Sequence, residues 1–99
     1  MKLQTNPAGG LIHDELEARG ISAAKAARDM VIPRSRLSDI SAGRKGVSAD
    51  TALRLERYLG ISASLLIRLQ AEYDLSKAAA DKGPQIQLEI RPASDLTTA

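Results

Sequence analysis

Apolar residues recur along the chain at the three- and four-residue spacing of short amphipathic helices. Within residues 22–43, small apolar side chains and a methionine fall on one face of a first helix, and Leu37 and Ile40 fall on the inner face of a second. Pro33 lies between the two helices, and its fixed φ and missing N–H allow it only at the start of a helix or outside one. We therefore predict two short helices joined by a tight turn in this segment.

Three further helices are expected, over residues 11–19, 49–59 and about 63–81, the first after a turn-rich lead-in at residues 7–10. Residues 42–46 are expected to form a loop. Serines that can accept a hydrogen bond from a free backbone N–H precede three of the predicted helices, and glycines that tolerate positive φ end two of them. These residues are Ser22, Ser48 and Ser62, and Gly20 and Gly60.

The last predicted helix has apolar residues on more than one face. One stripe is expected to pack on the domain core and consists of Leu65, Leu66, Leu69 and Tyr73. A second stripe consists of Ile67, Ala71, Leu75 and Ala78. A small domain cannot cover a terminal helix on both sides, so the second stripe predicts a homodimer interface. Partial exposure of a few alanines and one isoleucine is the alternative.

The C-terminal segment has a different pattern. Gly83 and Pro84 are expected to end the helix, and residues 85–91 alternate strictly between polar and apolar. This alternation predicts a half-buried strand with Ile86, Leu88 and Ile90 on one face. A lone strand must pair with its copy, pair with another protein, or be disordered when free. Residues 1–82 are thus expected as a helical domain, and residues 83–99 as an extension with a strand and a loose terminus after Pro92.

Composition limits the possible classes of protein. The 99 residues fit one domain with a tail, and the absence of cysteine excludes disulfides and thiolate metal sites. No apolar run approaches the roughly 18 residues of a membrane span, and the N-terminus lacks the apolar core of a signal peptide. We therefore expect a cytoplasmic protein with no membrane partner.

The charge is unevenly distributed. Residues 21–69 carry nine basic against four acidic side chains, net +5, whereas residues 70–99 carry three against five, net −2. A basic body with an acidic end suggests a polyanion on one side and a basic partner on the other. Chance variation of surface charge is the alternative.

The sequence carries little sign of catalysis. His13 is the only histidine, no cysteine can assist it, and the carboxylates show no metal-binding or nucleotide-binding spacing. We expect no enzyme activity, no catalytic residue, no metal and no cofactor.

The second short helix of residues 22–43 has the residues for reading DNA. Its first turn and middle would face base edges in a major groove, where arginine can bind guanine bidentately and a carboxylate can accept from cytosine. The candidate base-reading residues are Arg34, Ser35, Ser38 and Asp39, although Asp39 can instead orient a neighbouring arginine. The candidate phosphate contacts are Ser22, Lys25, Arg36, Arg44 and Lys45.

Three strings, PRSRLSDI, SAGRKGVSADTALRLERYLG and LQAEYDL, closely resemble the HigA/VapI-type antitoxins of the XRE helix-turn-helix superfamily. The resemblance covers about residues 7–78. It implies an all-α, five-helix, lambda-repressor-like DNA-binding domain, here with a short C-terminal strand or extended tail. It also implies an antitoxin of a bacterial type II toxin–antitoxin system. Such a protein would neutralise a small basic RelE/ParE-like (HigB-type) toxin, an mRNA endonuclease, and would repress its own operon as a dimer on a palindromic double-stranded operator.

The chain departs from the family pattern at four places. The family's turn usually has glycine where this chain has Val31, and a β-branched residue in the left-handed conformation is strained, so the turn is open to rebuilding. Ala23 replaces a frequent glutamine, an aromatic residue is replaced by Leu65 and Leu66, and the lead-in at residues 7–9 matches only loosely. Two alternatives to the antitoxin are a stand-alone repressor of the same superfamily and a protein–protein adaptor that has lost DNA binding.

Overall fold

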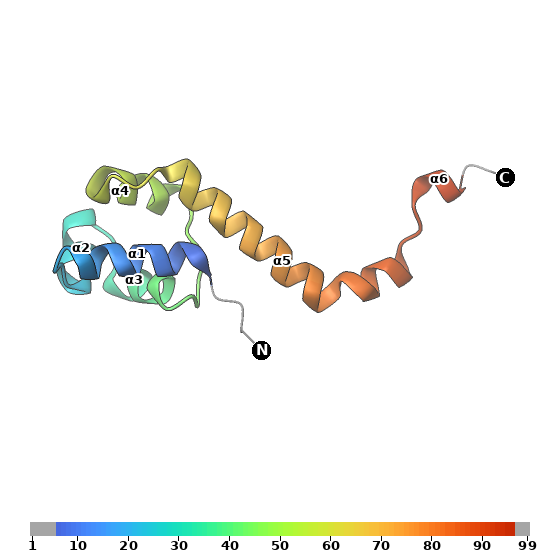
Figure 1. The fold of residues 1–99 in the computed structure, drawn as a ribbon, viewed down its shortest axis with the longest axis horizontal. Coiled ribbons are helices and arrows are strands. Elements are labelled where there is room, and N and C mark those ends of the chain that lie inside the picture. Colours follow the sequence, from blue (N-terminus) through green and yellow to red (C-terminus); the bar gives the residue numbers. More distant parts are fainter. Residues whose placement is uncertain (1–5, 97–99) are drawn as a thin grey trace.

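The computed structural model describes residues 6–96, which form six helices and no strand. The helices are α1 (Pro7–Ala18), α2 (Ala23–Met30), α3 (Arg34–Ser41), α4 (Ala49–Leu59), α5 (Ala63–Glu89) and α6 (Ala93–Leu96). Helices α1 to α4 and the first half of α5 form a compact body, and the second half of α5 projects away from it (Figure 1). The molecule therefore measures 63 × 30 × 20 Å.

The core lies where the first five helices meet. Helix α1 packs on α3 and α5, α2 packs on α3 and α4, and α4 packs on α5. The largest fully buried apolar side chains are Ile12, Leu37, Ile40, Leu55 and Leu66, one or two from each of four helices. The inner face predicted for α3 is thus confirmed, since Leu37 and Ile40 are both buried. Between residues 6 and 96, no helix has the length and apolar character needed to cross a membrane.

The predicted helix boundaries at serine and glycine are confirmed. The Oγ atoms of Ser22, Ser48 and Ser62 accept hydrogen bonds from backbone N–H groups three residues later, at 3.1, 3.2 and 3.2 Å. Gly20 and Gly60 have φ values of 66° and 76°, the left-handed conformation that ends α1 and α4. Side-chain capping and positive φ depend on only a few neighbouring residues, so the sequence alone could predict these helix ends.

Helix α1 begins earlier than predicted. Residues 7–10 form its first turn rather than a lead-in, because Asn6 caps the helix by accepting from Ala8 N–H at 3.0 Å. Proline is well suited to the first helical position, where its missing N–H would have no partner. Gly9 is buried against the backbone carbonyl of Ile40, so the first turn of α1 packs directly on α3.

The predicted strand over residues 85–91 is wrong. Helix α5 continues through Gly83 and Pro84 to Glu89, so it also crosses the expected boundary after residue 82, and it bends in its second half (Figure 1). A helix satisfies its own backbone groups, whereas a lone strand leaves them unpaired. Gln85 and Glu89 add a side-chain hydrogen bond of 2.8 Å one turn apart.

The alternating residues consequently share no single buried face. Ile86, Leu88 and Ile90 are all exposed, and only Ile90, at the end of the helix, has an extended backbone. The expected loose terminus contains the short helix α6, and its residues 97–99 lie outside the described residues.

Candidate nucleic-acid interface

Helices α2 and α3 form the predicted two-helix unit, and the turn between them keeps a left-handed residue. Val31 has φ 58° and ψ 49°, and it is 77% exposed. The following residue, Ile32, is buried, and its N–H donates to the Ala27 carbonyl at 3.0 Å. Val31 therefore adopts the conformation that glycine would supply, and the turn is not rebuilt.

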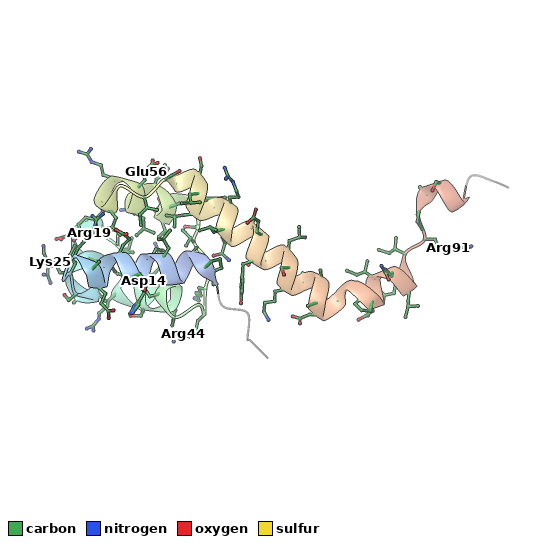
Figure 2. All side chains as sticks on the ribbon, in the orientation of Figure 1. Asp14, Arg19, Lys25, Arg44, Glu56 and Arg91 are labelled. Carbon is green, nitrogen blue, oxygen red and sulfur yellow. The ribbon has the colours of Figure 1, made fainter. Side chains whose placement is uncertain are left out.

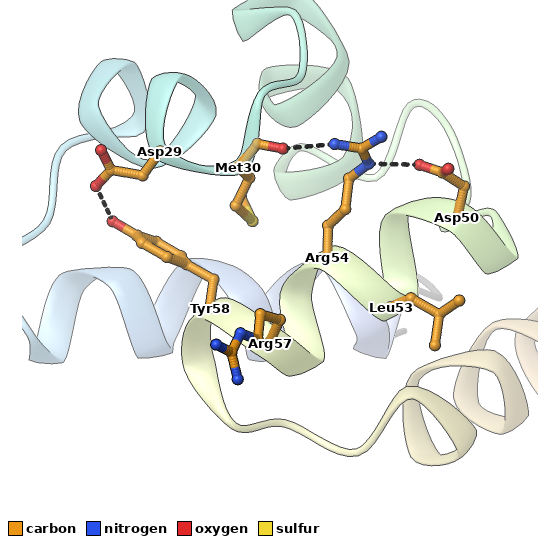
Figure 3. Close-up of a pocket in the computed structure, with 7 residues that line it drawn as sticks. All are labelled: Asp29, Met30, Asp50, Leu53, Arg54, Arg57 and Tyr58. Atoms are coloured by element: carbon orange, nitrogen blue, oxygen red, sulfur yellow. Dashed lines mark hydrogen bonds and ion pairs between the residues drawn. The ribbon is translucent and has the colours of Figure 1, made fainter.

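The guanidinium of Arg54 braces this turn from α4. One of its nitrogens donates to the Met30 carbonyl at 2.9 Å, and Nε donates to Asp50 at 2.6 Å (Figure 3). This ion pair lowers the pKa of Asp50. The i,i+4 spacing of the two residues could have predicted the pair, but the contact with Met30 depends on the tertiary fold and was missed.

The first turn of α3 points into solvent. Arg34, Ser35 and Arg36 are exposed, while Leu37 and Ile40 are buried on the opposite side. Pro33 precedes the helix and provides no side-chain cap. The Arg36 N–H donates to the Pro33 carbonyl at 3.1 Å, which leaves the N–H groups of Arg34 and Ser35, at the positive end of the helix dipole, available to an anion beside the arginines.

Further along α3, Asp39 is hydrogen-bonded to Arg44 of the following loop. Its carboxylate accepts from Arg44 Nε at 2.8 Å, and its backbone carbonyl accepts from the N–H groups of Arg44 and Lys45 at 2.8 and 3.2 Å. Of the two roles suggested for Asp39, orienting an arginine is the one that this structure contains. Ser38, beside it, is half-buried.

The structure brings two of the predicted phosphate-binding residues together. Arg36 of α3 and Lys45 of the following loop line one surface hollow of about 460 Å³ between α3 and α4. Neither side chain forms an ion pair with another described residue. Asp50 lines the same hollow, and the Arg36 charge helps to lower the pKa of its carboxyl group, so Lys45 is the less engaged of the two cations.

The predicted phosphate contacts on α2 are partly engaged within the protein. Lys25 Nζ lies 2.8 Å from Asp29, and the Tyr58 hydroxyl of α4 donates to the same carboxylate at 2.6 Å (Figure 3). These hydrogen bonds lower the pKa of Asp29 and raise the pKa of Lys25 and of Tyr58. Ser22 uses its Oγ to cap α2. Figure 2 shows Lys25 and Arg44 apart on the surface of the helical body.

Asp29 and Tyr58 also border a surface pocket of about 560 Å³ between α2 and α4 (Figure 3). Its lining also includes Met30, Leu53 and Arg57. Among residues 6–96, no group of three or more histidine, aspartate or glutamate side chains is placed to hold a metal ion.

The predicted dimer stripe lies on the outside of α5. Ile67 is 38% exposed, Leu75 is 73% exposed, and Ala71 and Ala78 are exposed between and beyond them. Ile67 also lines a hollow of about 450 Å³ with Leu53 of α4.

The core stripe predicted on the same helix is buried only at Leu66: Leu69 and Tyr73 are half-buried, and the prediction is wrong for Leu65, which is exposed at the start of the helix. The second buried residue of α5 is Gln70. Gln70 is a polar residue between the apolar positions of this face, which could have indicated a buried side chain with hydrogen-bond partners. The sequence analysis did not identify it.

Comparison with known proteins matches this arrangement to a family. The sequence profile described as "Helix-turn-helix" matches residues 12–66, from within α1 to the first turn of α5. Virulence-associated protein I of Dichelobacter nodosus is 39% identical over 75 residues, which cover 75% of this chain and 69% of that protein.

Two solved structures have the same fold. The Pseudomonas aeruginosa antitoxin HigA, solved with the higBA promoter, is 41% identical with a TM-score of 0.79. An addiction module antidote protein of the HigA family from Coxiella burnetii is 32% identical with a TM-score of 0.76. Each match covers 86% of this chain and 94% of the other.

Proposed function

Because this chain belongs to the XRE-type helix-turn-helix family and is similar to HigA- and VapI-type antitoxins, we propose that it is the antitoxin of a type II toxin–antitoxin system. In this proposal it binds and neutralises a RelE/ParE-like (HigB-type) mRNA endonuclease. It also binds a palindromic operator as a dimer and represses its own operon. Its place of action is the cytoplasm of a bacterium.

The observation that carries the DNA-binding part is the uncapped, exposed first turn of α3. Arg34 and Ser35 are exposed on this turn, and Pro33 gives it no side-chain cap. When α3 lies in a major groove, Arg34 can bind guanine O6 and N7, with Ser35, Ser38 and Asp39 near the adjoining bases. The P. aeruginosa relative was solved with promoter DNA, which supports the same use here.

Phosphate contacts would fix the helix in the groove. Arg36 and Lys45 supply two charges from one hollow, and Arg44 lies on the same loop as Lys45. Ser22 and Lys25 would flank the groove from the start of α2. Such contacts position the protein without reading sequence, and each phosphate that they neutralise makes binding weaker at high salt.

The dimer is proposed to form through α5. Pairing of Ile67, Ala71, Leu75 and Ala78 with the same stripe of a second copy would bury the apolar side chains that a single chain leaves exposed. A two-fold dimer of this kind places its two α3 helices about 34 Å apart, one turn of DNA. An operator with two inverted half-sites follows from that symmetry.

The toxin is proposed to bind the C-terminal part. Residues 70–99 carry a net charge of −2, which suits a small basic partner. Ile86, Leu88 and Ile90 add exposed apolar side chains at the end of α5. Because Ile86 and Leu88 lie on α5 and Ile90 directly follows it, the toxin would meet a helix end and not a strand edge.

Two measurements on the full chain test the proposal. The first is binding to the DNA upstream of its own gene, with a shuffled sequence of the same composition as the control. The second is co-expression with the product of the adjacent gene, followed by copurification and growth rescue. Selective DNA binding without a copurifying partner would instead indicate a stand-alone repressor. Copurification without DNA binding would instead indicate a protein-binding adaptor.

A further inference from the structure

The loop between α3 and α4, residues 42–48, carries two of the cations proposed for DNA phosphates. On one side it is tied to α3, because the N–H groups of Arg44 and Lys45 both donate to the Asp39 carbonyl. These bonds fix the first half of the loop only. The second half, which leads into α4, is held from a different direction.

Gln70 of α5 holds the second half of the loop. Its side chain is buried, and Oε1 accepts from Val47 N–H at 3.1 Å and from Asn6 Nδ2 at 2.8 Å. Its Nε2 donates to Asp74 Oδ1 at 2.8 Å. One amide group thus joins the loop, the N-cap of α1 and the next turn of α5, and each of its polar atoms has a partner.

Gly46 is the residue that lets the loop approach so closely. A Cβ atom at this position would lie 2.8 Å from Gln70 Cδ and 2.9 Å from Nε2. The amide cannot move aside without losing hydrogen bonds in a buried place, where an unsatisfied polar group is costly. Loop and side chain are therefore fitted to each other, with Lys45 immediately before the point of contact.

We propose that Gln70 is a positioning residue for DNA binding. It clamps residues 42–48 onto α5 and so holds Lys45 and Arg44 where they can contact DNA phosphates. The inference rests on the proposed function for its DNA, although the clamp itself is a contact within this chain. Fixing the loop before binding removes the entropic cost of ordering it in the complex. If the loop is loosened, both cations keep their charge but occupy a range of positions. They then neutralise fewer phosphates, and fewer counterions are released from the DNA on binding.

The test uses a random-sequence DNA duplex, because phosphate contacts are independent of sequence. In Gln70→Leu, the Val47 amide should exchange its hydrogen at least about ten-fold faster. The dependence of log K on log salt should become shallower by about one for each phosphate that the protein no longer neutralises. The matched control is Gln85→Leu, which removes an exposed glutamine and its 2.8 Å bond to Glu89 on the same helix and should leave both readouts unchanged.

A charge-neutral rescue separates positioning from folding. In Gln70→Glu with Asp74→Asn, the new carboxylate can still accept from Asn6 and Val47, and the new amide can donate back to it. This double variant should recover the salt slope of the unmodified chain, while Gly46→Ala should lower the slope as Gln70→Leu does. If Gln70→Leu does not fold, the salt slopes of the double variant and of Gly46→Ala test the positioning role in its place.

Three results would overturn the inference. A folded Gln70→Leu with the unmodified salt slope would do so, as would a folded Gly46→Ala with that slope. Failure of the unmodified chain to bind any DNA would overturn the proposed function and this inference with it. In that third case the Val47 exchange rates would still report whether the clamp exists, which distinguishes the two failures.

Discussion

Arg54 donates a hydrogen bond to the carbonyl of Met30 at 2.9 Å, one residue before the left-handed Val31. Helix α4 thereby supports the turn that sets α3 relative to α2. The turn also closes through the backbone, since Val31 N–H donates to Arg28 O at 3.2 Å and Ile32 N–H donates to Ala27 O at 3.0 Å. Neither kind of bond needs the valine side chain.

Val31→Gly is therefore expected to stabilise the protein by about 1 kcal/mol, because a left-handed conformation is costly for a β-branched residue and free for glycine. The valine is 77% exposed, so its removal takes away little buried surface. Chemical denaturation measures the change. Val31→Ala serves as the control, since the left-handed conformation is also unfavourable for alanine. A Val31→Gly protein that unfolds at lower denaturant than the parent would show that the turn is not strained.

Gly9 and Gly10 are adjacent in α1 but should respond oppositely to alanine. A Cβ at Gly9 would collide with the Ile40 carbonyl, whereas a Cβ at Gly10 meets nothing within 4 Å. Gly9→Ala is expected to destabilise the fold by roughly 1–3 kcal/mol through overpacking against α3. Gly10→Ala should stabilise it by roughly 0.5–1 kcal/mol, because alanine favours the helix. Denaturant unfolding of both variants measures the difference, and equal effects at both positions would contradict the close packing of α1 on α3.

The acid side of the stability profile should depend on Asp29. Its pKa lies below its usual value of 3.8 because Lys25 and Tyr58 donate hydrogen bonds to the carboxylate. A carboxyl group whose pKa is lowered by folding contributes stability above that usual value, and loses it as the pH falls through the lowered pKa. Asp29→Asn should therefore flatten the decline of unfolding free energy on acidification.

The measurement for this variant is denaturant unfolding at a series of pH values from neutral down into the acid range. Asp14→Asn removes an exposed carboxylate of α1 that has no ion pair with another described residue, so it is a suitable control. Identical acid slopes for the parent and Asp29→Asn would mean that the contact between α2 and α4 is not held by this carboxylate.

Arg34 and Lys45 should differ in the kind of DNA binding they support. Arg34→Ala is expected to cost about 1–3 kcal/mol on the operator and to relax base choice at one position in each half-site. Lys45→Ala should weaken specific and random DNA alike. Titrations of both variants on both duplexes measure the contrast. If Arg34→Ala weakened binding to the two duplexes equally, a base-reading role for Arg34 would have to be abandoned.

The features that sequence alone predicted are those decided within a few residues. Ser48 and Gly60 mark the ends of α4 because capping and positive φ are local properties, and Leu37 and Ile40 mark the inner face of α3 because burial follows helical spacing. The same reasoning put Arg34 and Ser35 on the outer face, where the structure has them.

The features that the sequence did not predict depend on contacts between distant segments. The alternation in residues 85–91 fits a strand, but no second strand is present in residues 6–96 to pair with it, so the helix continued through Pro84. The links from Gln70 to Val47 and from Tyr58 to Asp29 span 23 and 29 residues. No local pattern indicates such partners, although a glutamine within an apolar stripe was a visible hint.

The outer half of α5 has a consequence for measurements in dilute solution. Leu75, Ile86 and Leu88 are exposed on a stretch of helix that has left the core, and such a helix is marginal in water without tertiary packing. Association that covers it would favour its helical state by mass action. In the dimer proposed above, helix content is therefore coupled to protein concentration, so far-ultraviolet dichroism recorded over a dilution series would follow assembly.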